Sequence, residues 1–363
     1  MKKKKLLIWG TGAVARTFVQ QYAVTYEKYF DIVGFINSNK EGKFHGWEIY
    51  KPNRIHDLEW DKILLCTLSD LVQEEMLQYL DDIYVDRTKV DFYSKRKGMN
   101  LLKEFVQDRY RDCEDKEIKE ILEYLSEHEL TVYNQYVPEE STIYQYYQDD
   151  EGDPYVYIGN KRMYYPKEIV DITKTPFRKN IFMEQTEYSP HRYIQENHEV
   201  HGGDVIVDAG VCEGNFSIQY VDIASKLHLI EMDKRWCRAL EKTFAPWRNK
   251  VTIHNVALSK EDGRVERRLD TLIKENIDFL KMDIEGAEID ALLGAKELLE
   301  RSNAICSICA YHRTYDEKYI RFILEAYGYT TKTSDGYMAF VWDKNWYDKL
   351  DFRRGIVYAQ KRI

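Results

Sequence analysis

Apolar residues recur along the chain in short runs, separated by polar turns or amphipathic stretches. In the C-terminal half these runs predict buried strands at 205–208, 227–230, 251–257, 277–282 and 304–310. The stretch after 283 predicts a helix that ends near Leu299. Strands that alternate with helices are typical of an α/β fold with a doubly wound, mostly parallel sheet.

The N-terminal pattern is shorter but of the same kind. It predicts strands and helices at 6–9, 13–22, 32–36, 63–66 and 69–80. This order begins a second, smaller doubly wound sheet, so we expect a Rossmann-like domain over residues 1–97.

Residues 98–188 are expected to connect this domain to a catalytic domain at 189–363. Apolar residues at helical spacing predict helices at 99–111 and 115–130, and the segment 133–165 is dense in tyrosine. Tyrosine suits carbohydrate stacking or an interface, and it equally suits a short sheet with one wet face.

Composition excludes some function classes. The 363 residues include 53 Lys and Arg against 62 Asp and Glu, a net charge of −9, so no global basic field favours nucleic acid. No apolar run is long enough to span a bilayer, and the scattered cysteines suit reduced thiols, so we expect a cytoplasmic protein. Cys306 and Cys309 lie in a predicted strand, where positions three apart face opposite sides, and this disfavours a zinc site.

The segment 205–217 carries the first candidate chemistry. A buried strand ends at Asp208, and Gly210 and Gly214 allow a tight turn into a helix with close approach of a ligand. The next strand ends at Glu231, a carboxylate that can accept both ribose hydroxyls of an adenosine.

Carboxylates gather again after the strand at 277–282. Asp283 and Glu285 follow Lys281 at the strand end, and His312 follows the strand at 304–310. Because the carboxyl ends of parallel strands share one edge of a sheet, we expect these groups to meet where ligands bind.

These motifs, with Asn255-Val256-Ala257-Leu258-Ser259 and Lys281-Met282-Asp283-Ile284-Glu285-Gly286-Ala287-Glu288, resemble the FkbM family of methyltransferases. The resemblance implies a seven-stranded class I fold with 336–342 as the antiparallel strand, and methyl transfer from S-adenosylmethionine (SAM), commonly to a hydroxyl. It implies a cofactor site formed by Asp208, Gly210, Glu213, Gly214, Asn215, Glu231, Met232, Asn255, Ala257 and Asp283.

Transfer to a hydroxyl requires removal of a proton. In one scheme His312 is a metal-free base; in the other Asp283, Glu285 and His312 bind Mg²⁺ or Mn²⁺. Lys281 is expected to pair near these catalytic groups. The expected substrate contacts are His191, Arg192, Tyr311 and Arg313, the first two in the opening turn of a helix after Pro190.

The N-terminal segment resembles the Rossmann-like domains that precede catalytic domains in bacterial polysaccharide-biosynthesis proteins. Gly10-Thr11-Gly12, the strand end at Asn37 and the segment 46–50 carry this resemblance. A dinucleotide site would need an acid where Asn37 stands, so NAD binding is disfavoured. The domain could bind a sugar nucleotide or serve only assembly.

The leading hypothesis is therefore a SAM-dependent O-methyltransferase that acts on a sugar or glycan precursor as a homo-oligomer, with no nucleic-acid partner and no integral membrane segment. The alternatives are a peptide or carboxylate acceptor, or a non-catalytic protein that binds SAM or a nucleotide sugar. An oxidoreductase or epimerase acting at the N-terminal site is the third class.

Overall fold

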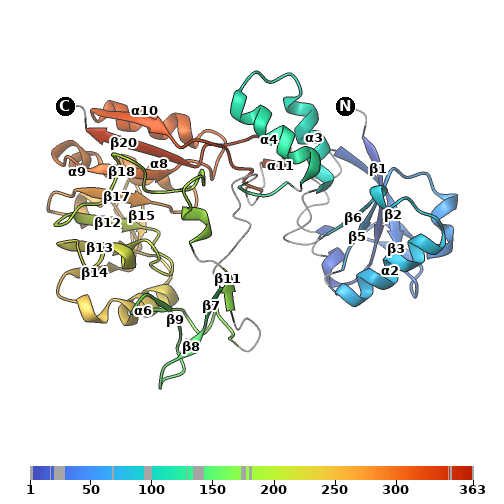
Figure 1. Ribbon diagram of the computed structural model, residues 1–363, viewed down its shortest axis with the longest axis horizontal. Coiled ribbons are helices and arrows are strands. Elements are labelled where there is room, and N and C mark those ends of the chain that lie inside the picture. Colours follow the sequence, from blue (N-terminus) through green and yellow to red (C-terminus); the bar gives the residue numbers. More distant parts are fainter. Residues whose placement is uncertain are drawn as a thin grey trace. The chain divides into compact units, whose positions relative to one another are not determined.

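The computed structural model describes residues 3–16, 18–19, 29–67, 69–93, 100–128, 130–133, 143–172, 177–179, 182–341, 343 and 346–361. The chain divides into two compact units, whose elements are labelled in Figure 1. The N-terminal unit comprises Met1–Asn134 with Lys344–Asp351, and the C-terminal unit comprises Gln135–Asp343 with Phe352–Ile363. No helix in the described ranges is both long and apolar enough to cross a membrane.

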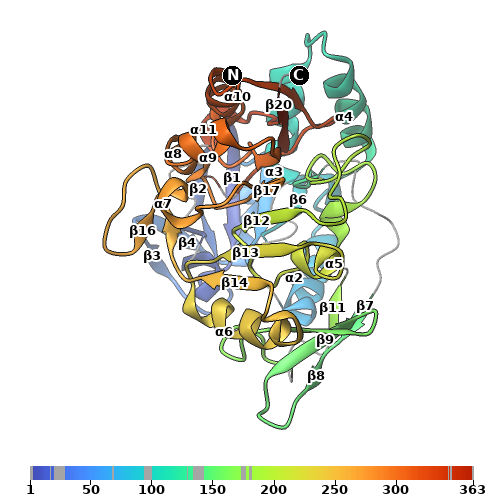
Figure 2. The ribbon, with the colours of Figure 1, turned by 90° about the vertical axis from the view of Figure 1, so that its left-hand side faces the viewer.

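The C-terminal unit is organised around a seven-stranded sheet in the order β14-β13-β12-β17-β18-β20-β19. Its strands are β12 (Val205–Ala209), β13 (Lys226–Ile230), β14 (Val251–His254), β17 (Phe279–Met282), β18 (Ile305–Cys309), β19 (Tyr329–Thr333) and β20 (Ile356–Lys361). Figure 2 shows β14, β13, β12 and β17 side by side in this order. The sheet has the predicted class I methyltransferase topology, and all the predicted central strands form.

The antiparallel strand is not the one expected. β20 pairs antiparallel with both β18 and β19, whereas the described part of the expected strand, residues 336–341, forms only an isolated bridge, between Met338 and Arg353. The prediction that 336–342 supplies this strand is wrong. Residues Ile356, Val357, Tyr358 and Ala359 are almost fully buried, as expected for a strand with neighbours on both sides.

Helices cover the sheet of the C-terminal unit. They are α5 (Ser217–Tyr220), α6 (Lys234–Thr243), α7 (Leu269–Leu272), α8 (Glu288–Leu293), α9 (Lys296–Arg301) and α10 (Asp316–Ala326). The single helix expected to end near Leu299 is broken in two between α8 and α9. Gly294 stands at the break, where an added Cβ would lie 2.2 Å from the carbonyl oxygen of Ser259, so this close approach admits only glycine.

The tyrosine-rich segment forms small antiparallel sheets within the C-terminal unit. One joins β8 (Tyr147–Gln148), β9 (Pro154–Ile158) and β10 (Lys161–Tyr164), and the other joins β7 (Ile143–Gln145) and β11 (Phe177–Lys179). Outside the tyrosine-rich segment, β15 (Ala257–Leu258) and β16 (Glu266–Arg267) form a separate parallel pair. The amide of Tyr164 donates to the hydroxyl of Thr243 at 2.9 Å, and this bond ties β10 to α6.

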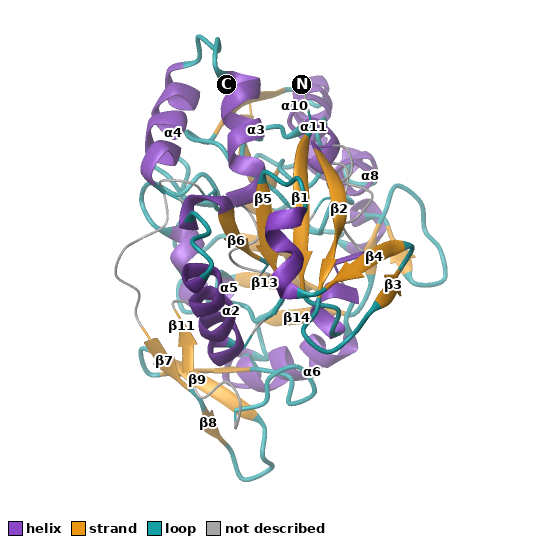
Figure 3. Cartoon of the chain, turned by 90° about the vertical axis from the view of Figure 1, so that its right-hand side faces the viewer, coloured by secondary structure: helices purple, strands orange, loops and turns teal. Residues whose placement is uncertain are grey.

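The N-terminal unit contains a six-stranded sheet in the order β3-β4-β2-β1-β5-β6 (Figure 3). Its strands are β1 (Lys4–Trp9), β2 (Phe30–Ile36), β3 (Gly42–Phe44), β4 (Trp47–Tyr50), β5 (Lys62–Leu65) and β6 (Val90–Phe92). β1 pairs in parallel with β2 on one side and β5 on the other. The smaller α/β sheet predicted from the sequence is therefore present.

Helices of the N-terminal unit follow the predicted spacing. Residues 13–16 and 18–19 are helical, and the α-helices with fully described ends are α2 (Asp70–Asp82), α3 (Asn100–Tyr110), α4 (Lys116–Glu127) and α11 (Trp346–Lys349). Short 3-10 turns lie at η1 (Pro52–Asp57) and η2 (Arg87–Lys89). The expected connector is thus divided: α3 and α4 belong to the N-terminal unit and the tyrosine-rich sheets to the C-terminal unit.

Candidate active site

The glycine loop after β12 is shaped by the approach of a neighbouring strand. Gly210 has φ +75°, and a Cβ there would lie 1.7 Å from the carbonyl oxygen of Asp283. The amide of Asp283 donates to the carbonyl of Ala209 at 2.9 Å. The ends of β12 and β17 are therefore so close that only glycine fits between them.

A buried ion pair lies beneath this loop. Lys281 Nζ is 3.0 Å from Asp208 Oδ1 and donates to the carbonyl oxygen of Gly210 at 2.7 Å. Ser217 Oγ donates to Asp208 Oδ2 at 2.6 Å. Burial lowers the pKa of Lys281, but Asp208 and Asp283 raise it more, and the net shift is upward. Asp208 is fully buried, so it supports the loop from below.

Glu231 stands at the end of β13, as predicted. Its carboxylate accepts the amides of Cys212 at 3.1 Å and Asp233 at 2.8 Å. A carboxylate has further lone pairs, so these bonds leave it able to accept hydroxyl donors. The next side chain, Met232, is 71% exposed, which places an apolar group beside the acid.

Asn255 fixes the neighbouring backbone. Its Nδ2 donates to the carbonyl oxygens of Glu231 and Met232, both at 3.0 Å, and Ala257 starts β15 shortly after it. Asn255 therefore positions the end of β13.

The rest of the predicted cofactor loop lies between β12 and α5. Glu213 is 8% exposed, and Asn215 accepts a hydrogen bond from Gln219 through its carbonyl oxygen. Gly214 has φ +85°, and an added Cβ would lie 3.0 Å from the side chains of Leu240 on α6 and of Phe244 directly after it.

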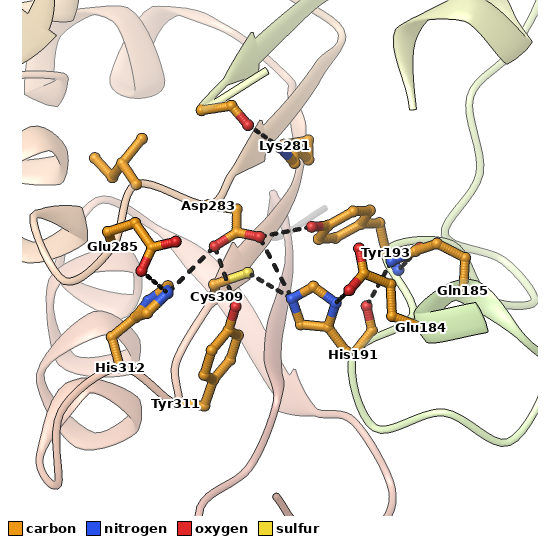
Figure 4. A network of polar contacts seen from close by, with 12 residues as sticks. Glu184, Gln185, His191, Tyr193, Lys281, Asp283, Glu285, Cys309, Tyr311 and His312 are labelled. Carbon is orange, nitrogen blue, oxygen red and sulfur yellow. Dashed lines mark hydrogen bonds and ion pairs between the residues drawn. The ribbon is translucent and has the colours of Figure 1, made fainter. Parts of the chain in front are cut away.

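Asp283 is the centre of a polar network at the carboxyl edge of the sheet (Figure 4). Tyr193 donates its hydroxyl to Oδ2 at 2.8 Å, and Tyr311 donates to Oδ1 at 3.3 Å. Nε2 of His191 lies 3.4 Å from Oδ2, and Nε2 of His312 lies 3.4 Å from Oδ1. Four side chains, two from residues 191–193 and two from residues 311–312, thus converge on one carboxylate.

The surroundings of Asp283 determine its ionisation. Burial opposes the charged form, but the hydrogen bond and charge of His191 favour it, as do the charges of Lys281 and His312. The net effect holds the pKa of Asp283 well below its usual range. Asp283 is therefore ionised at physiological pH and is suited to orienting a donor rather than to accepting a proton permanently.

His312 is held between two acids. It is 4% exposed, its Nδ1 lies 3.1 Å from Oε1 of the buried Glu288, and its Nε2 lies 3.6 Å from Oε2 of Glu285. Burial lowers the pKa of His312, but Glu288, Asp283 and Glu285 raise it more, so the net pKa shift is upward. Glu285 itself is 86% exposed and covers this side of the ring.

The expected helix after Pro190 is absent, because residues 190 and 191 form a turn and the chain continues without helix to 194. The backbone carbonyls that a helix would use are bonded elsewhere. Gln185 Nε2 donates to the carbonyl of His191 at 2.9 Å, and Ser307 Oγ donates to that of Tyr193 at 2.7 Å. That prediction is wrong for this physical reason.

The four expected substrate contacts divide into two groups. His191, which is 2% exposed, and Tyr311, which is 7% exposed, belong to the Asp283 network. Arg192 reaches the carbonyl of Glu187 at 3.5 Å, and the side chain of Arg313 is exposed at the surface near Gly286.

Possible metal ligands also gather here. Asp283, Glu288 and His312 have ligand atoms within 4.8 Å of one another, as do His191, Asp283 and Cys309. The first group contains Glu288 as the second carboxylate, whereas the metal scheme predicted from the sequence used Glu285.

Sequence reasoning missed the roles of Tyr193, Glu288 and Cys309. Cys309 Sγ lies 3.5 Å from Nε2 of His191, and burial raises the pKa of its thiol. Glu288 was visible as the last acid of the motif at 281–288. No local signal could assign Tyr193, since its contact spans 90 positions.

Asn37 of the N-terminal unit has a structural role. Its Nδ2 donates to Thr11 Oγ1 at 2.7 Å, and its Oδ1 accepts the amides of Asn39 and Lys40, both at 2.8 Å. The side chain therefore ties the glycine turn to the end of β2, where a dinucleotide fold would use an acid for ribose.

Comparisons with known proteins found two family models. Residues 218–331 match the family model described as Methyltransferase FkbM domain, and residues 2–90 match the one described as C2185-like, N-terminal. No curated protein matches the chain.

Among solved structures, the methyltransferase FkbM from Methylobacillus flagellatus is similar, with 14% identity and a TM-score of 0.49, over 99% of this chain and 90% of that chain. Magnesium protoporphyrin IX methyltransferase from Synechocystis, solved with bound SAM, has 17% identity and a TM-score of 0.31, over 44% and 71%. Precorrin-6y C5,15-methyltransferase from Geobacter metallireducens has 12% identity and a TM-score of 0.32, over 46% and 85%.

Proposed function

Because residues 218–331 match the family model described as Methyltransferase FkbM domain, we propose that this protein transfers the methyl group of SAM to a hydroxyl of a sugar or glycan precursor. The observation that carries the proposal is the edge of the sheet where β12, β13, β17 and β18 end. Four groups lie at these strand ends: the loop at Gly210, Glu231, Asp283 and His312. This is where α/β sheets of this kind bind ligands.

The cofactor would occupy the ends of β12 and β13. The loop at Gly210 would receive the methionine part of SAM, and Glu231 would accept the ribose hydroxyls. The exposed side chain of Met232 would pack against the adenine. Asn255 and the Lys281–Asp208 pair support this surface from behind.

The His312–Glu288 pair favours an acceptor that must lose a proton. Glu288 beside Nδ1 favours the tautomer that carries its proton there, which leaves Nε2 free to accept one. A carboxylate acceptor would already be ionised and would need no such base. We therefore favour a hydroxyl acceptor over the carboxylate alternative.

Methyl transfer itself requires mainly that SAM and the acceptor are held in the right relative position. The sulfonium is already activated, and holding donor and acceptor in line supplies several kcal/mol. We infer that the acceptor hydroxyl displaces the exposed carboxylate of Glu285 and reaches Nε2 of His312. The ionised Asp283, fixed by two tyrosine hydroxyls, would orient the hydroxyl and stabilise the imidazolium that forms.

A metal-assisted route is the second scheme. The carboxylates of Asp283 and Glu288 suit Mg²⁺ or Mn²⁺, whereas the imidazole of His312 better suits a transition metal such as Zn²⁺. However, Glu288 is 1% exposed and its Oε1 already accepts the amide of Ile284 at 2.9 Å, and Asp283 already accepts from two tyrosines. A cation held by both Glu288 and Nδ1 of His312 would have to replace the 3.1 Å contact between them, so the metal-free route fits the residues better.

The tyrosines of β8 and β9 support a sugar acceptor. Tyr147 and Tyr157 are 42% and 40% exposed, and their rings pack at a centroid distance of 5.3 Å. The guanidinium of Arg162 lies 6.0 Å from the ring centre of the exposed Tyr157. Exposed flat rings beside a cation suit stacking against sugar faces.

The test is transfer of labelled methyl groups from SAM to a panel of sugars, nucleotide sugars and lipid-linked sugars, with peptides and carboxylic acids as comparators. We expect label in a hydroxyl-bearing acceptor and a loss of about 100-fold or more in His312→Gln. Activity that EDTA abolishes and Mg²⁺ restores would replace the base scheme with the metal scheme. Label in peptides or acids alone would contradict the proposed acceptor.

A further inference from the structure

A crevice in the N-terminal unit takes no part in the chemistry described above. Its volume is about 510 Å³, and its lining includes Trp9, Ser38, Lys51, Asn53, Glu75 and Tyr79. These residues come from four different segments of the unit, which makes the crevice a product of the fold rather than of one loop.

The topology places this crevice at the ligand-binding edge of the sheet. Trp9 ends β1, Ser38 follows β2, and Lys51 follows β4, so the crevice opens at the carboxyl ends of three parallel strands. β1 has β2 on one side and β5 on the other, so the chain reverses its direction of winding at β1 (Figure 3). Open α/β sheets bind ligands at this kind of reversal.

One wall of the crevice is aromatic. Trp9 and Tyr79 pack edge to face, with ring centroids 5.5 Å apart and planes at 87°. Trp9 is 4% exposed, whereas Tyr79 is partly exposed on the crevice side of α2. A partly exposed ring fixed by a buried one presents a rigid flat surface, which suits a planar heterocycle.

The rim carries polar groups of three kinds. Lys51 donates to the carbonyl of Ser38 at 3.1 Å and lies 3.4 Å from Glu41, so its ammonium is held at the rim. Glu75 on α2 and Asn53 after β4 are exposed. A cation, a carboxylate and an amide around a flat apolar wall match phosphate, ribose hydroxyls and the edge of a base respectively.

We propose that this crevice binds a nucleotide, with its base against Tyr79, its ribose hydroxyls at Glu75 and its phosphate at Lys51. The ligand is not a dinucleotide held in the usual way, because Asn37 stands where such a site has an acid for the ribose. Its side chain is already hydrogen-bonded to Thr11 and to a backbone amide. The site gives the N-terminal unit a recognition role of its own. Since the residues of the crevice all belong to that unit, nucleotide binding there can be tested independently of methyl transfer.

Calorimetric titration of the full chain tests this assignment. The probes are UMP, UDP, GMP, GDP, AMP and ADP, with the corresponding nucleosides as phosphate-free comparators. We expect at least one nucleotide to bind about tenfold or more tightly than its nucleoside, because Lys51 adds a charge-assisted contact. Lys51→Met should abolish that preference, whereas Lys43→Met, on β3 and outside the crevice, should keep it.

A second pair of variants separates ribose recognition from general charge. Glu75→Gln should weaken binding of the ribonucleotide more than that of its 2′,3′-dideoxy analogue, and Glu74→Gln, its neighbour on α2, should leave both unchanged. Absence of binding by every nucleotide in wild-type protein that still binds SAM would overturn the proposal. Equal binding by Lys51→Met and Lys43→Met would overturn it as well.

Discussion

Lys281 and Asp208 form a buried ion pair across two neighbouring strands, with 3.0 Å between Nζ and Oδ1 and less than 5% exposure of either side chain. The pair lies directly under the carbonyl of Gly210, to which Lys281 also donates. It therefore couples the stability of the sheet to the shape of the cofactor loop.

Lys281→Met should lower the free energy of unfolding by roughly 3–5 kcal/mol, because it leaves the buried, charged Asp208 without its ion-pair partner. Chemical denaturation measures this loss. Lys296→Met removes an exposed lysine of α9 and should change the free energy by less than about 1 kcal/mol. The double variant Lys281→Met with Asp208→Asn should recover part of the loss; equal stability of Lys281→Met and Lys296→Met would contradict the pairing.

Gly210→Ala should destabilise the protein far more than Gly203→Ala. Both positions have positive φ, which costs an alanine roughly 1 kcal/mol. At Gly203 nothing lies within 4 Å of an added Cβ, whereas at Gly210 the carbonyl of Asp283 lies 1.7 Å away and must move. Thermal unfolding of the two variants compares the costs, and similar melting temperatures would show that β12 and β17 are not in this close contact.

The rate of methyl transfer should rise with pH as His312 loses its proton. Burial lowers the pKa of His312, but the carboxylates, mainly Glu288, raise it more. The pH of half-maximal activity should therefore lie above the ordinary histidine pKa of about 6.5. Glu288→Gln removes that charge and should move the rise to lower pH. A pH–rate profile of kcat under saturating SAM measures both, and an unshifted profile in Glu288→Gln would show that another group is the base.

Asp316 should make the protein less stable as pH rises. Burial raises the pKa of Asp316 to about 6, above the unfolded value of 3.8, although the hydrogen bond from the amide of Arg313 lowers this pKa in part. The folded state therefore binds this proton more tightly, and the advantage present below pH 3.8 is lost as pH rises through about 6.

Replacing Asp316 isolates this effect. Asp316→Asn should be more stable than wild type by roughly 1–3 kcal/mol well above pH 6, with little difference near pH 4. Asp290→Asn, an exposed acid of α8, should show no such pH dependence. A constant difference between Asp316→Asn and wild type across this pH range would refute the assigned shift.

Much of the fold follows from local pattern. The central strands β12, β13, β17 and β18 could be predicted because each is a short, mostly apolar run, and the first three are followed directly by Gly210, Glu231 and Asp283. The antiparallel strand could not be assigned, because 336–342 and 356–361 are both short and rich in apolar residues. What separates them is pairing with β18 and β19, which the local sequence does not encode.

The candidate site was predictable in part for a similar reason. Asp283 and His312 stand at strand ends, and parallel topology brings strand ends together. His191 and Tyr193 reach Asp283 because the non-helical segment that contains them packs against the sheet. Gly355, directly before β20, leaves room there for the carbonyl of Pro190. Such contacts arise from packing between segments that are far apart in sequence, so no spacing rule reveals them.

The most direct test of SAM binding at β12 and β13 is thermal unfolding of the protein with SAM or its demethylated product, compared with NAD. At about 100 times its dissociation constant, each SAM species should stabilise the folded state by roughly 2.7 kcal/mol, and Glu231→Gln should need a higher concentration for the same shift. No shift with either SAM species, together with a shift from NAD, would contradict the proposed methyl transfer and move the chemistry to the N-terminal unit.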